Sequence, residues 1–265
     1  MTPIEVLFER PGRSPSFAIP GALAEAYGGD FGLPRPLLFA NFVSSIDGVV
    51  ALPGPVESGR IVSGGSEPDR FVMALLRACA DAVVIGAGTF RHANGAHWRA
   101  EDAYPSAANL FSDLRKHLGL RPQPRLVVVT ASGKIDPAQP ALRDALIATT
   151  LAGEARLRGA LPAGARIVVL GSGLASLIEG LHSQGLQSVL TEGGPTLVGQ
   201  FVDDGLLDEL FLTVSPKLFG RSSDDGRKSL VDGHLRAAQD LELVSARRHE
   251  SHLFLRYARK RGYRE

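Results

Sequence analysis

Short apolar segments alternate with segments of helical periodicity through the middle of the chain. Runs rich in apolar and β-branched residues, typical of buried strands, occupy residues 37–43, 82–85, 126–129, 166–170 and 188–190. Apolar residues recur at helical spacing in residues 69–80, 175–184 and 196–203. Strands that alternate with helices predict a mostly parallel sheet with helices on both faces.

The end of the chain has a different pattern, because strand-like segments follow one another there with little helix between them. These segments are residues 209–214, 241–246 and 253–257. We therefore expect antiparallel strands to complete the sheet. The predicted fold class is α/β, a three-layer, mostly parallel sheet with antiparallel C-terminal strands.

Prolines and glycines are frequent in the first 36 residues, which include six prolines. Because proline fixes φ and lacks a backbone N–H, this segment cannot form long regular elements. We expect an irregular extension over residues 1–36 and one domain over residues 37–260. A chain of 265 residues with 44% hydrophobic content is long enough to bury a full core.

Charge and cysteine content exclude several kinds of function. Lys and Arg total 29 against 28 Asp and Glu, so the net charge of +1 gives no electrostatic case for nucleic acid or an anionic membrane. The single cysteine, Cys79, excludes an intrachain disulfide and a zinc site with several thiolates. The histidines are scattered, so we expect no metal site. No apolar run reaches membrane-spanning length and no basic-then-apolar leader is present, which predicts a cytoplasmic protein.

The segment Leu190-Thr191-Glu192-Gly193-Gly194-Pro195-Thr196-Leu197 combines a strand, an acid, two glycines and a helix that begins with proline. The glycines allow a ligand to approach the backbone, and the unpaired amides of a helix N-terminus attract an anion. Glu192 would lie at the carboxyl end of the strand, where open α/β sheets bind ligands. An ordinary strand-to-helix turn explains a lone Gly-Gly equally well.

Two further glycine turns follow apolar strands, Gly86-Ala87-Gly88-Thr89 and Gly171-Ser172-Gly173. The dinucleotide fingerprint G-x-G-x-x-G is absent from the sequence. Each turn alone is explained by a tight connection. Together, at one sheet edge, the three turns favour an extended ligand with several phosphate or ribose groups, such as a dinucleotide.

The segment Asn41-Phe42-Val43-Ser44-Ser45-Ile46-Asp47-Gly48 runs from a strand into small polar residues and an acid. Asp-Gly alone marks a turn, but the polar residues before it can supply hydrogen bonds to a heterocycle. Asp69 is expected to cap the next helix. Arg77, on that helix, is by default a solvated residue, yet it is one of few cations near these loops.

Taken together, these segments resemble the pyrimidine reductase family of riboflavin biosynthesis, which includes the reductase domain of the bifunctional deaminase-reductase and whose fold is similar to dihydrofolate reductase. The resemblance also includes Leu76-Arg77-Ala78, Ala80-Asp81-Ala82 and Leu207-Asp208-Glu209-Leu210 through Pro216 and Gly220, in the same order from residue 37 to 257. It implies an NADPH-dependent reductase that converts the ribosylamino group of a 5′-phosphorylated pyrimidine, such as 5-amino-6-(5-phosphoribosylamino)uracil, into a ribitylamino group by hydride transfer.

The resemblance also implies roles for individual residues. The expected cofactor contacts are Val43, Gly86, Thr89, Thr130, Ser132, Gly171, Gly193, Gly194, Pro195, Thr196, Leu197 and Val198. The expected substrate contacts are Asn41, Ser45, Asp47, Ser58, Arg77 and Glu192, with the arginine suited to the ribose phosphate. Asp47 or Glu192 is expected to relay a proton. Thr130, Ser132 and Lys134 could hold the 2′-phosphate of NADPH, although the same residues are typical of a surface turn.

The sequence departs from the family pattern after Thr89. Many members have an aspartate-proline, leucine-threonine and arginine stretch there, whereas residues 90–98 are Phe-Arg-His-Ala-Asn-Gly-Ala-His-Trp. Bifunctional members carry a zinc deaminase domain with paired cysteines, which a chain with one cysteine cannot form. Two alternatives therefore stay open: dihydrofolate reductase or another NADPH-dependent reduction, and nucleotide binding without turnover. A homodimer through residues 210–214 or 253–257 is also expected.

Overall fold

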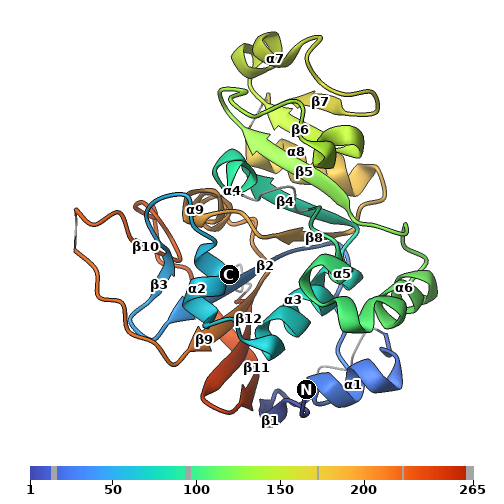
Figure 1. The fold of residues 1–265 in the computed structure, drawn as a ribbon, viewed down its shortest axis with the longest axis vertical. Coiled ribbons are helices and arrows are strands. Elements are labelled where there is room, and N and C mark those ends of the chain that lie inside the picture. The colour runs from blue at the N-terminus through green and yellow to red at the C-terminus, as the bar shows by residue number, and fades with distance from the viewer. Residues whose placement is uncertain (13–16, 93–96, 172, 223, 261–265) are drawn as a thin grey trace, which may run out of the picture.

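The computed structural model describes residues 1–12, 17–92, 97–171, 173–222 and 224–260. Its centre is a ten-stranded sheet with the order β1-β11-β12-β9-β2-β8-β4-β5-β6-β7 (Figure 1). The strands are β1 (Glu5–Glu9), β2 (Leu37–Ser45), β4 (Ala82–Gly86), β5 (Arg125–Thr130), β6 (Leu146–Thr149), β7 (Arg166–Val169), β8 (Ser188–Thr191), β9 (Glu209–Ser215), β11 (Leu241–His249) and β12 (His252–Arg259). Two short strands, β3 (Val49–Ala51) and β10 (Lys228–Ser229), form a separate ribbon.

Strand direction divides the large sheet into two parts. The neighbouring strands from β9 through β2, β8, β4, β5 and β6 to β7 run parallel. By contrast, β12, β11 and β1 are each antiparallel to their neighbours. The mostly parallel sheet with antiparallel C-terminal strands predicted from the sequence is therefore confirmed.

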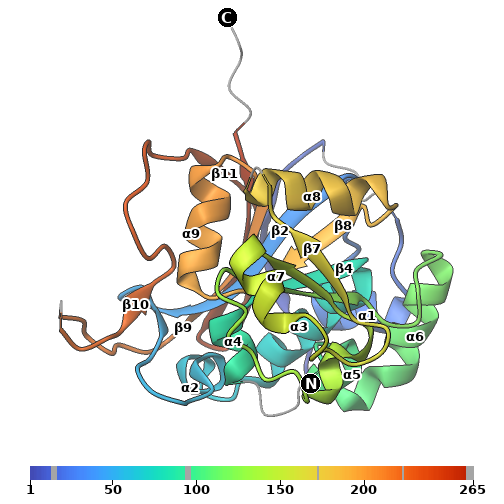
Figure 2. The same ribbon diagram turned by 90° about the horizontal axis from the view of Figure 1, so that it is seen from above.

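Helices cover both faces of the sheet, as Figure 2 shows. On one face, α1 (Gly21–Tyr27), α3 (Glu67–Cys79) and α6 (Ala108–His117) pack into a core that includes Phe39, Phe71 and Phe111. On the other face, α8 (Leu174–Ser183) and α9 (Pro195–Asp203) pack into a second core around Phe201. The three-layer arrangement follows because the central strands are apolar on both sides and each side needs a cover.

The shorter elements were not predicted from periodicity. They include α2 (Ser58–Ser63), α4 (Ala87–Arg91), α5 (Ala100–Ala103) and α7 (Leu151–Leu157). Each of these helices has seven residues or fewer, which is too few turns for an apolar stripe to repeat. None of the helices in the described ranges is both long and apolar enough to span a membrane.

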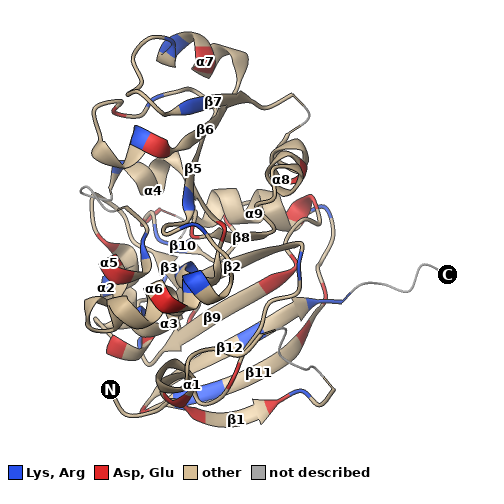
Figure 3. Ribbon diagram, turned by 90° about the vertical axis from the view of Figure 1, so that its right-hand side faces the viewer, with Lys and Arg blue, Asp and Glu red and all other residues tan. Residues whose placement is uncertain are grey.

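The first 36 residues differ from the expected irregular extension. Strand β1 forms an edge of the main sheet by pairing with β11, and α1 joins the core through Leu23 and Tyr27. The Arg247 side chain, 3% exposed, donates to the Tyr27 carbonyl at 3.1 Å and to Glu9 at 2.8 Å. Figure 3 shows basic positions on β11 and β12 beside acidic positions on β1 and β9. These partners are far away in sequence, so local composition could not reveal the strand.

Candidate active site

The parallel strands β2, β8, β4 and β5 end at one edge of the sheet, where open α/β sheets bind their ligands. Most of the residues predicted to bind cofactor or substrate lie in the segments that follow these four strands. Glu192 stays in the ladder, because its backbone N–H donates to the Val84 carbonyl of β4 at 3.1 Å. The sheet therefore fixes Glu192 and the glycines after it.

The two glycines after Glu192 form a cradle at the start of α9, in which Gly193 is buried and Gly194 is half-buried. A Cβ atom at Gly193 would lie 2.7 Å from Cδ2 of Leu197, so only glycine fits there without a shift. Gly194 is the N-cap of α9 and offers no side-chain hydrogen bond to the helix. A Cβ atom at Gly194 would lie 3.7 Å from Oγ1 of Thr89. The first turn of α9 and the Thr89 hydroxyl therefore border the same space, and the positive end of the helix dipole there suits an anion. Pro195 has no N–H, and the amides of Leu197 and Val198 donate to the Gly194 carbonyl at 3.0 and 3.1 Å, so the Thr196 amide is the helix donor nearest this space.

Other predicted cofactor contacts surround this cradle. Gly86 lies directly before α4, which also lacks a side-chain N-cap. The side chains of Leu197 and Val198 are buried in the core, so they can reach a ligand only through their backbone. Thr196 is exposed, and its hydroxyl donates to Asp232 at 3.0 Å. Val43 is half-buried on β2, and Pro195 is buried at the start of α9.

Three predicted cofactor contacts lie further along the sheet. The Thr130 side chain is buried at the end of β5, and its Oγ1 accepts a hydrogen bond from the Gly133 amide at 3.1 Å. Ser132 and Lys134 are exposed in the turn that follows. Gly171 follows β7, four strands from β8, which corresponds to roughly 19 Å at the usual strand spacing. Gly171 is therefore too remote to share a phosphate with Gly194.

Arg77 and Glu192 form a buried ion pair. Nη2 of Arg77 lies 2.6 Å from Oε2 of Glu192, and Nε lies 3.0 and 3.1 Å from the two carboxylate oxygens. Nη1 donates to the Arg99 carbonyl at 3.2 Å. The two side chains are only 10% and 9% exposed. The guanidinium therefore directs its main contacts to Glu192, and two of its five N–H groups are left for a ligand.

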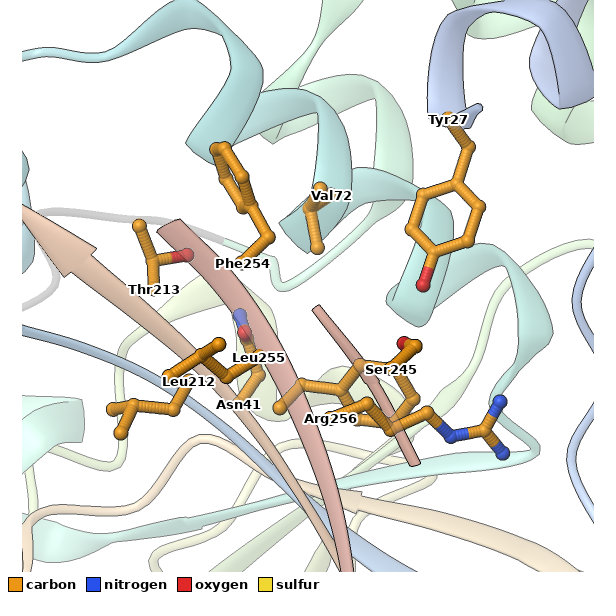
Figure 4. Close-up of a pocket in the computed structure, with 10 residues that line it drawn as sticks. Tyr27, Asn41, Val72, Leu212, Thr213, Ser245, Phe254, Leu255 and Arg256 are labelled. Carbon is orange, nitrogen blue, oxygen red and sulfur yellow. The ribbon is translucent and has the colours of Figure 1, made fainter. Parts of the chain in front are cut away.

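Asn41 lies beside this pair. Ala40 of β2 is in register with Thr191, the last residue of β8, so Asn41 of β2 lies next to Glu192, which follows β8. Asn41 also borders a small cavity of about 10 Å³ with Val72 of α3 and Thr213 of β9 (Figure 4). The structure thus brings together three of the predicted substrate contacts, Asn41, Arg77 and Glu192, on the α3 side of the sheet.

Asp47 links the loop after β2 to the loop after β9 by hydrogen bonds. Its carboxylate accepts hydrogen bonds from the Ser45 hydroxyl and from the amides of Phe219, at 3.1 Å, and Gly220, at 2.6 Å. The Ser45 hydrogen bond is the main cause that lowers the pKa of Asp47 below its usual 3.8. Asp47 is thus held as an anion. Ser58 is the first residue of α2, and its Oγ accepts from the Leu52 amide at 2.9 Å.

Asp69 does not cap α3 as the sequence suggested. Ser66 is the N-cap, and its Oγ accepts from the Asp69 amide at 3.3 Å. Asp69 is only 6% exposed, and Thr213 of β9, which is also buried, lies near its carboxyl. Desolvation is the largest cause that raises the pKa of Asp69 to about 6. A sequence pattern of helix starts cannot distinguish the cap from a residue three positions later, so this acid was missed.

Arg115 is a second residue that the sequence did not reveal. It is 3% exposed on α6, and its Nη1 donates to the carbonyls of Arg77, Ala78 and Ala80 at 3.1, 3.1 and 2.8 Å. These carbonyls close α3, so Arg115 fixes the end of the helix that carries Arg77. Burial lowers the pKa of Arg115 to about 10.

The segment that departs from the family pattern is partly described. Phe90 is fully buried and stacks on Trp98, with ring centroids 6.0 Å apart and an interplanar angle of 20°. The next residue, Arg99, supplies the carbonyl that Arg77 contacts. Residues 93–96 lie outside the described ranges. The segment of residues 90–98 is therefore followed directly by a residue that contacts the Arg77–Glu192 ion pair.

The mostly parallel sheet with helices on both faces, and the loops gathered at the carboxyl ends of its strands, place the protein among three-layer α/β proteins. Within this class, the chain belongs to the RibD C-terminal domain family, which matches residues 36–255. The matched range begins one residue before β2 and ends within β12, so it includes the cradle and the Arg77–Glu192 pair. Strand β1 and helix α1 lie outside it.

The chain is also similar to individual proteins. A 2,5-diamino-6-ribosylamino-4(3H)-pyrimidinone 5′-phosphate reductase of Archaeoglobus fulgidus is 28% identical over 194 residues, which cover 70% of this chain and 83% of that protein. A protein of the same name from Methanothermobacter thermautotrophicus is 28% identical over 205 residues, covering 75% and 85%. The crystal structure of a pyrimidine reductase-like protein from Corynebacterium diphtheriae superposes with a TM-score of 0.68 at 24% identity, covering 86% of this chain and 93% of that one.

Proposed function

We propose that the protein is an NADPH-dependent reductase that converts a 5′-phosphorylated ribosylaminopyrimidine into the ribitylamino product. The observation that carries this proposal is the direct succession of Glu192, on the α3 side of the sheet, and the Gly193-Gly194 cradle at the start of α9. One backbone segment thus joins a site for a polar substrate to a site for an anionic cofactor. The names of the two archaeal relatives agree with this activity.

The residues present fit a nicotinamide dinucleotide. A side chain at Gly193 would collide with Leu197, and α4 and α9 both begin without a side-chain cap, so the first turn of each would face the cofactor phosphates. We assign Gly86, Thr89 and Gly193 to Val198 to the nicotinamide half and its phosphates. The exposed Ser132 and Lys134, near β5, would hold the 2′-phosphate that distinguishes NADPH. When bound, the cofactor supplies the hydride.

The α3 side of the edge would hold the substrate. Arg77 fixes the Glu192 side chain through the ion pair, and the two remaining N–H groups of Arg77 would contact the ribose phosphate. Asn41 and Ser58 would contact the substrate from β2 and α2. These roles are proposals, and they rest on the proximity of Asn41, Arg77 and Glu192 described above.

Reduction of the ribosylamino group requires a hydride at C1′ and a proton at the ring oxygen, because the C1′–O4′ bond opens. Of the two acids predicted to relay this proton, Glu192 directly precedes the cradle, whereas the oxygens of Asp47 accept bonds from Ser45, Phe219 and Gly220. We therefore assign the proton relay to Glu192 and the loop geometry to Asp47.

The experiment is NADPH oxidation by the purified protein with three substrates side by side: the phosphorylated ribosylaminopyrimidine, its deaminated form and dihydrofolate. We expect turnover with at least one of the two ribosylaminopyrimidines. Turnover with dihydrofolate alone, or NADPH binding with no turnover of any of the three, would refute the proposal. The expected homodimer stays a prediction, which light scattering of the purified protein tests.

A further inference from the structure

A cavity of about 170 Å³ lies on the α9 face of the sheet, and the function proposed above does not use it. Of the ten described residues that line it, eight are Val or Leu. They include Val198 and Val202 of α9, Leu210 of β9 and Leu235, which belongs to the irregular segment of residues 230–240 before β11. The apolar side chains of this face therefore do not fill the space between α9, β9 and segment 230–240.

Segment 230–240 covers the cavity and is fixed to both ends of α9, beside which it runs in Figure 2. At the start of the helix, the Asp232 carboxylate accepts a hydrogen bond from the Thr196 hydroxyl at 3.0 Å. At the end of the helix, Arg236 donates to Asp203 from its amide at 2.7 Å and from Nε at 2.8 Å. An anion at the start of a helix and a cation at its end both complement the helix dipole. The chain thus supplies its own cover, and no second protein is needed to close the cavity.

The lining determines which class of ligand fits. An apolar cavity of about 150 Å³ stays dry and binds benzene, so the cavity behind α9 has room for one aromatic ring with a small alkyl substituent. Two of the described lining residues are polar, Arg259 and the exposed Gln239. The Arg259 guanidinium donates to the Gly205 carbonyl and lies 3.6 Å from the Asp208 carboxylate. Because protein groups already balance the charge of Arg259, the cavity suits a neutral apolar ligand rather than an anion.

The cavity and the cofactor cradle share helix α9. Val198 lines the cavity, and it lies in the first turn of α9, which begins at the cradle. Thr196, in the same turn, is bonded through its hydroxyl to Asp232 of segment 230–240. A ligand that packs between Val198 and this segment therefore stabilises the first turn of α9 in the position that forms the cradle. Binding at the two sites should be mutually favourable, and the coupling must be equal in both directions.

We propose that this cavity is a second ligand site, that it takes a neutral molecule with one compact apolar ring, and that its occupancy strengthens cofactor binding at the start of α9. The coupling rests on the proposed function, because it requires that the cradle binds NADPH, whereas the ligand site itself does not. The ring supplies the contacts that the lining side chains cannot make with one another. Because α9 and α3 cover opposite faces of the sheet, the ligand lies apart from the substrate. The site therefore serves an effector.

The test uses the full chain and toluene as the probe. Isothermal titration calorimetry without cofactor should show one toluene bound per chain with a Kd below about 1 mM. Benzoate, in which a carboxylate replaces the methyl group, should bind at least tenfold more weakly. Val202→Phe places a ring in the cavity from α9 and should weaken toluene binding at least tenfold. Leu235→Phe does the same from segment 230–240, which covers the case in which Val202→Phe does not fold. Val169→Phe, at an exposed valine of β7, should bind toluene like the wild-type protein.

The fluorescence of bound NADPH measures the coupling. With toluene at saturation, the Kd for NADPH should fall at least threefold, and the Kd for toluene should fall by the same factor with NADPH at saturation. Asp232→Ala releases segment 230–240 from Thr196, so this factor should approach one while toluene still binds. Unchanged NADPH affinity in the presence of toluene, or a factor that Asp232→Ala leaves intact, would overturn the coupling.

The site itself is decided by the titration without cofactor. No toluene binding by the wild-type protein, or undiminished binding in Val202→Phe and Leu235→Phe, would overturn it. If toluene does not bind and Leu235→Phe turns a dimer into monomers in light scattering, the cavity belongs to an interface between copies of the chain, and the inference is overturned. If the wild-type protein binds no NADPH, the proposed function is refuted and the coupling with it, whereas the toluene titration still decides the site.

Discussion

Breaking the ion pair between Arg77 and Glu192 should destabilise the protein more than the loss of its three hydrogen bonds alone would suggest. Both side chains are about nine-tenths buried, so removal of one leaves an uncompensated charge in the interior. Such a loss typically costs about 3–5 kcal/mol. We expect Arg77→Met and Glu192→Gln each to lower the free energy of unfolding by about 3 kcal/mol. The Arg77→Met change keeps most of the side-chain volume, so the cost reports the charge rather than a cavity.

A double-mutant cycle separates the pair from the packing around it. When both residues are replaced, no orphan charge remains, so the combined loss should be smaller than the sum of the two single losses by about 2 kcal/mol. The matched control is Lys116 and Asp113, which lie 3.0 Å apart but are 75% and 63% exposed. Replacement of either control residue should cost less than about 0.5 kcal/mol.

Urea denaturation at pH 7.5 gives these free energies, and NADPH oxidation gives the matching kinetics. Arg77→Met should lower kcat/KM for the phosphorylated pyrimidine at least a hundredfold and leave the KM for NADPH nearly unchanged, because the cradle does not contact Arg77. Additive losses in the cycle, or a single-variant loss below about 1 kcal/mol, would contradict the account of a buried and desolvated pair. An equal loss of cofactor binding and substrate binding would contradict the proposed role of Arg77 in the substrate site.

Three further predictions concern single residues. Gly193→Ala should raise the KM for NADPH at least tenfold in steady-state kinetics, because its Cβ would lie 2.7 Å from Leu197 and displace the start of α9. An unchanged KM would show that Gly193 does not contribute to cofactor binding. Arg115→Met should lower the urea-unfolding free energy by roughly 2–4 kcal/mol, because three carbonyls of α3 lose their donor; a loss below about 1 kcal/mol refutes this. Burial raises the pKa of Asp69 from 3.8 to about 6, so the folded protein keeps a proton that the unfolded chain releases, and stability falls as pH rises from about 4 to about 6. Asp69→Asn should remove this slope and gain about 3 kcal/mol over wild type between pH 4 and pH 7.5, and parallel pH profiles would contradict it.

The sequence was sufficient to predict the elements that carry their own pattern. The strand before Glu192 and the helix after Gly194 were predicted because apolar periodicity, two glycines and a proline all agree within one short segment. The same holds for the strand that contains Asn41. Elements held by distant partners were missed: every residue of β1 is exposed, and the strand depends on pairing with β11.

The candidate site shows the same division. The sequence predicted that Arg77 and Glu192 belong to one site, but not that they pair with each other across 115 positions. The sequence assigned Asp69 to a helix cap, because Asp is a favoured N-cap residue. Ser is favoured there too, and Ser66 is the N-cap in the structure. Whether an acid near a helix start is a cap or a buried group depends on the element packed above it, here β9 with Thr213. That information is absent from any local window.

Strand β8 links the two halves of the proposed reaction. Glu192 faces α3, which also carries Arg77 and Asp69, whereas the next residue, Gly193, packs against Leu197 of α9 on the opposite face of the sheet. The proposed substrate site and the proposed cofactor site are therefore set by different helices but meet at two adjacent residues that follow β8, whose Cα atoms lie about 3.8 Å apart. Hydride transfer requires reacting atoms about 3–3.5 Å apart. The position of α3, fixed at its end by Arg115, is then the variable that decides whether a bound pyrimidine comes within reach.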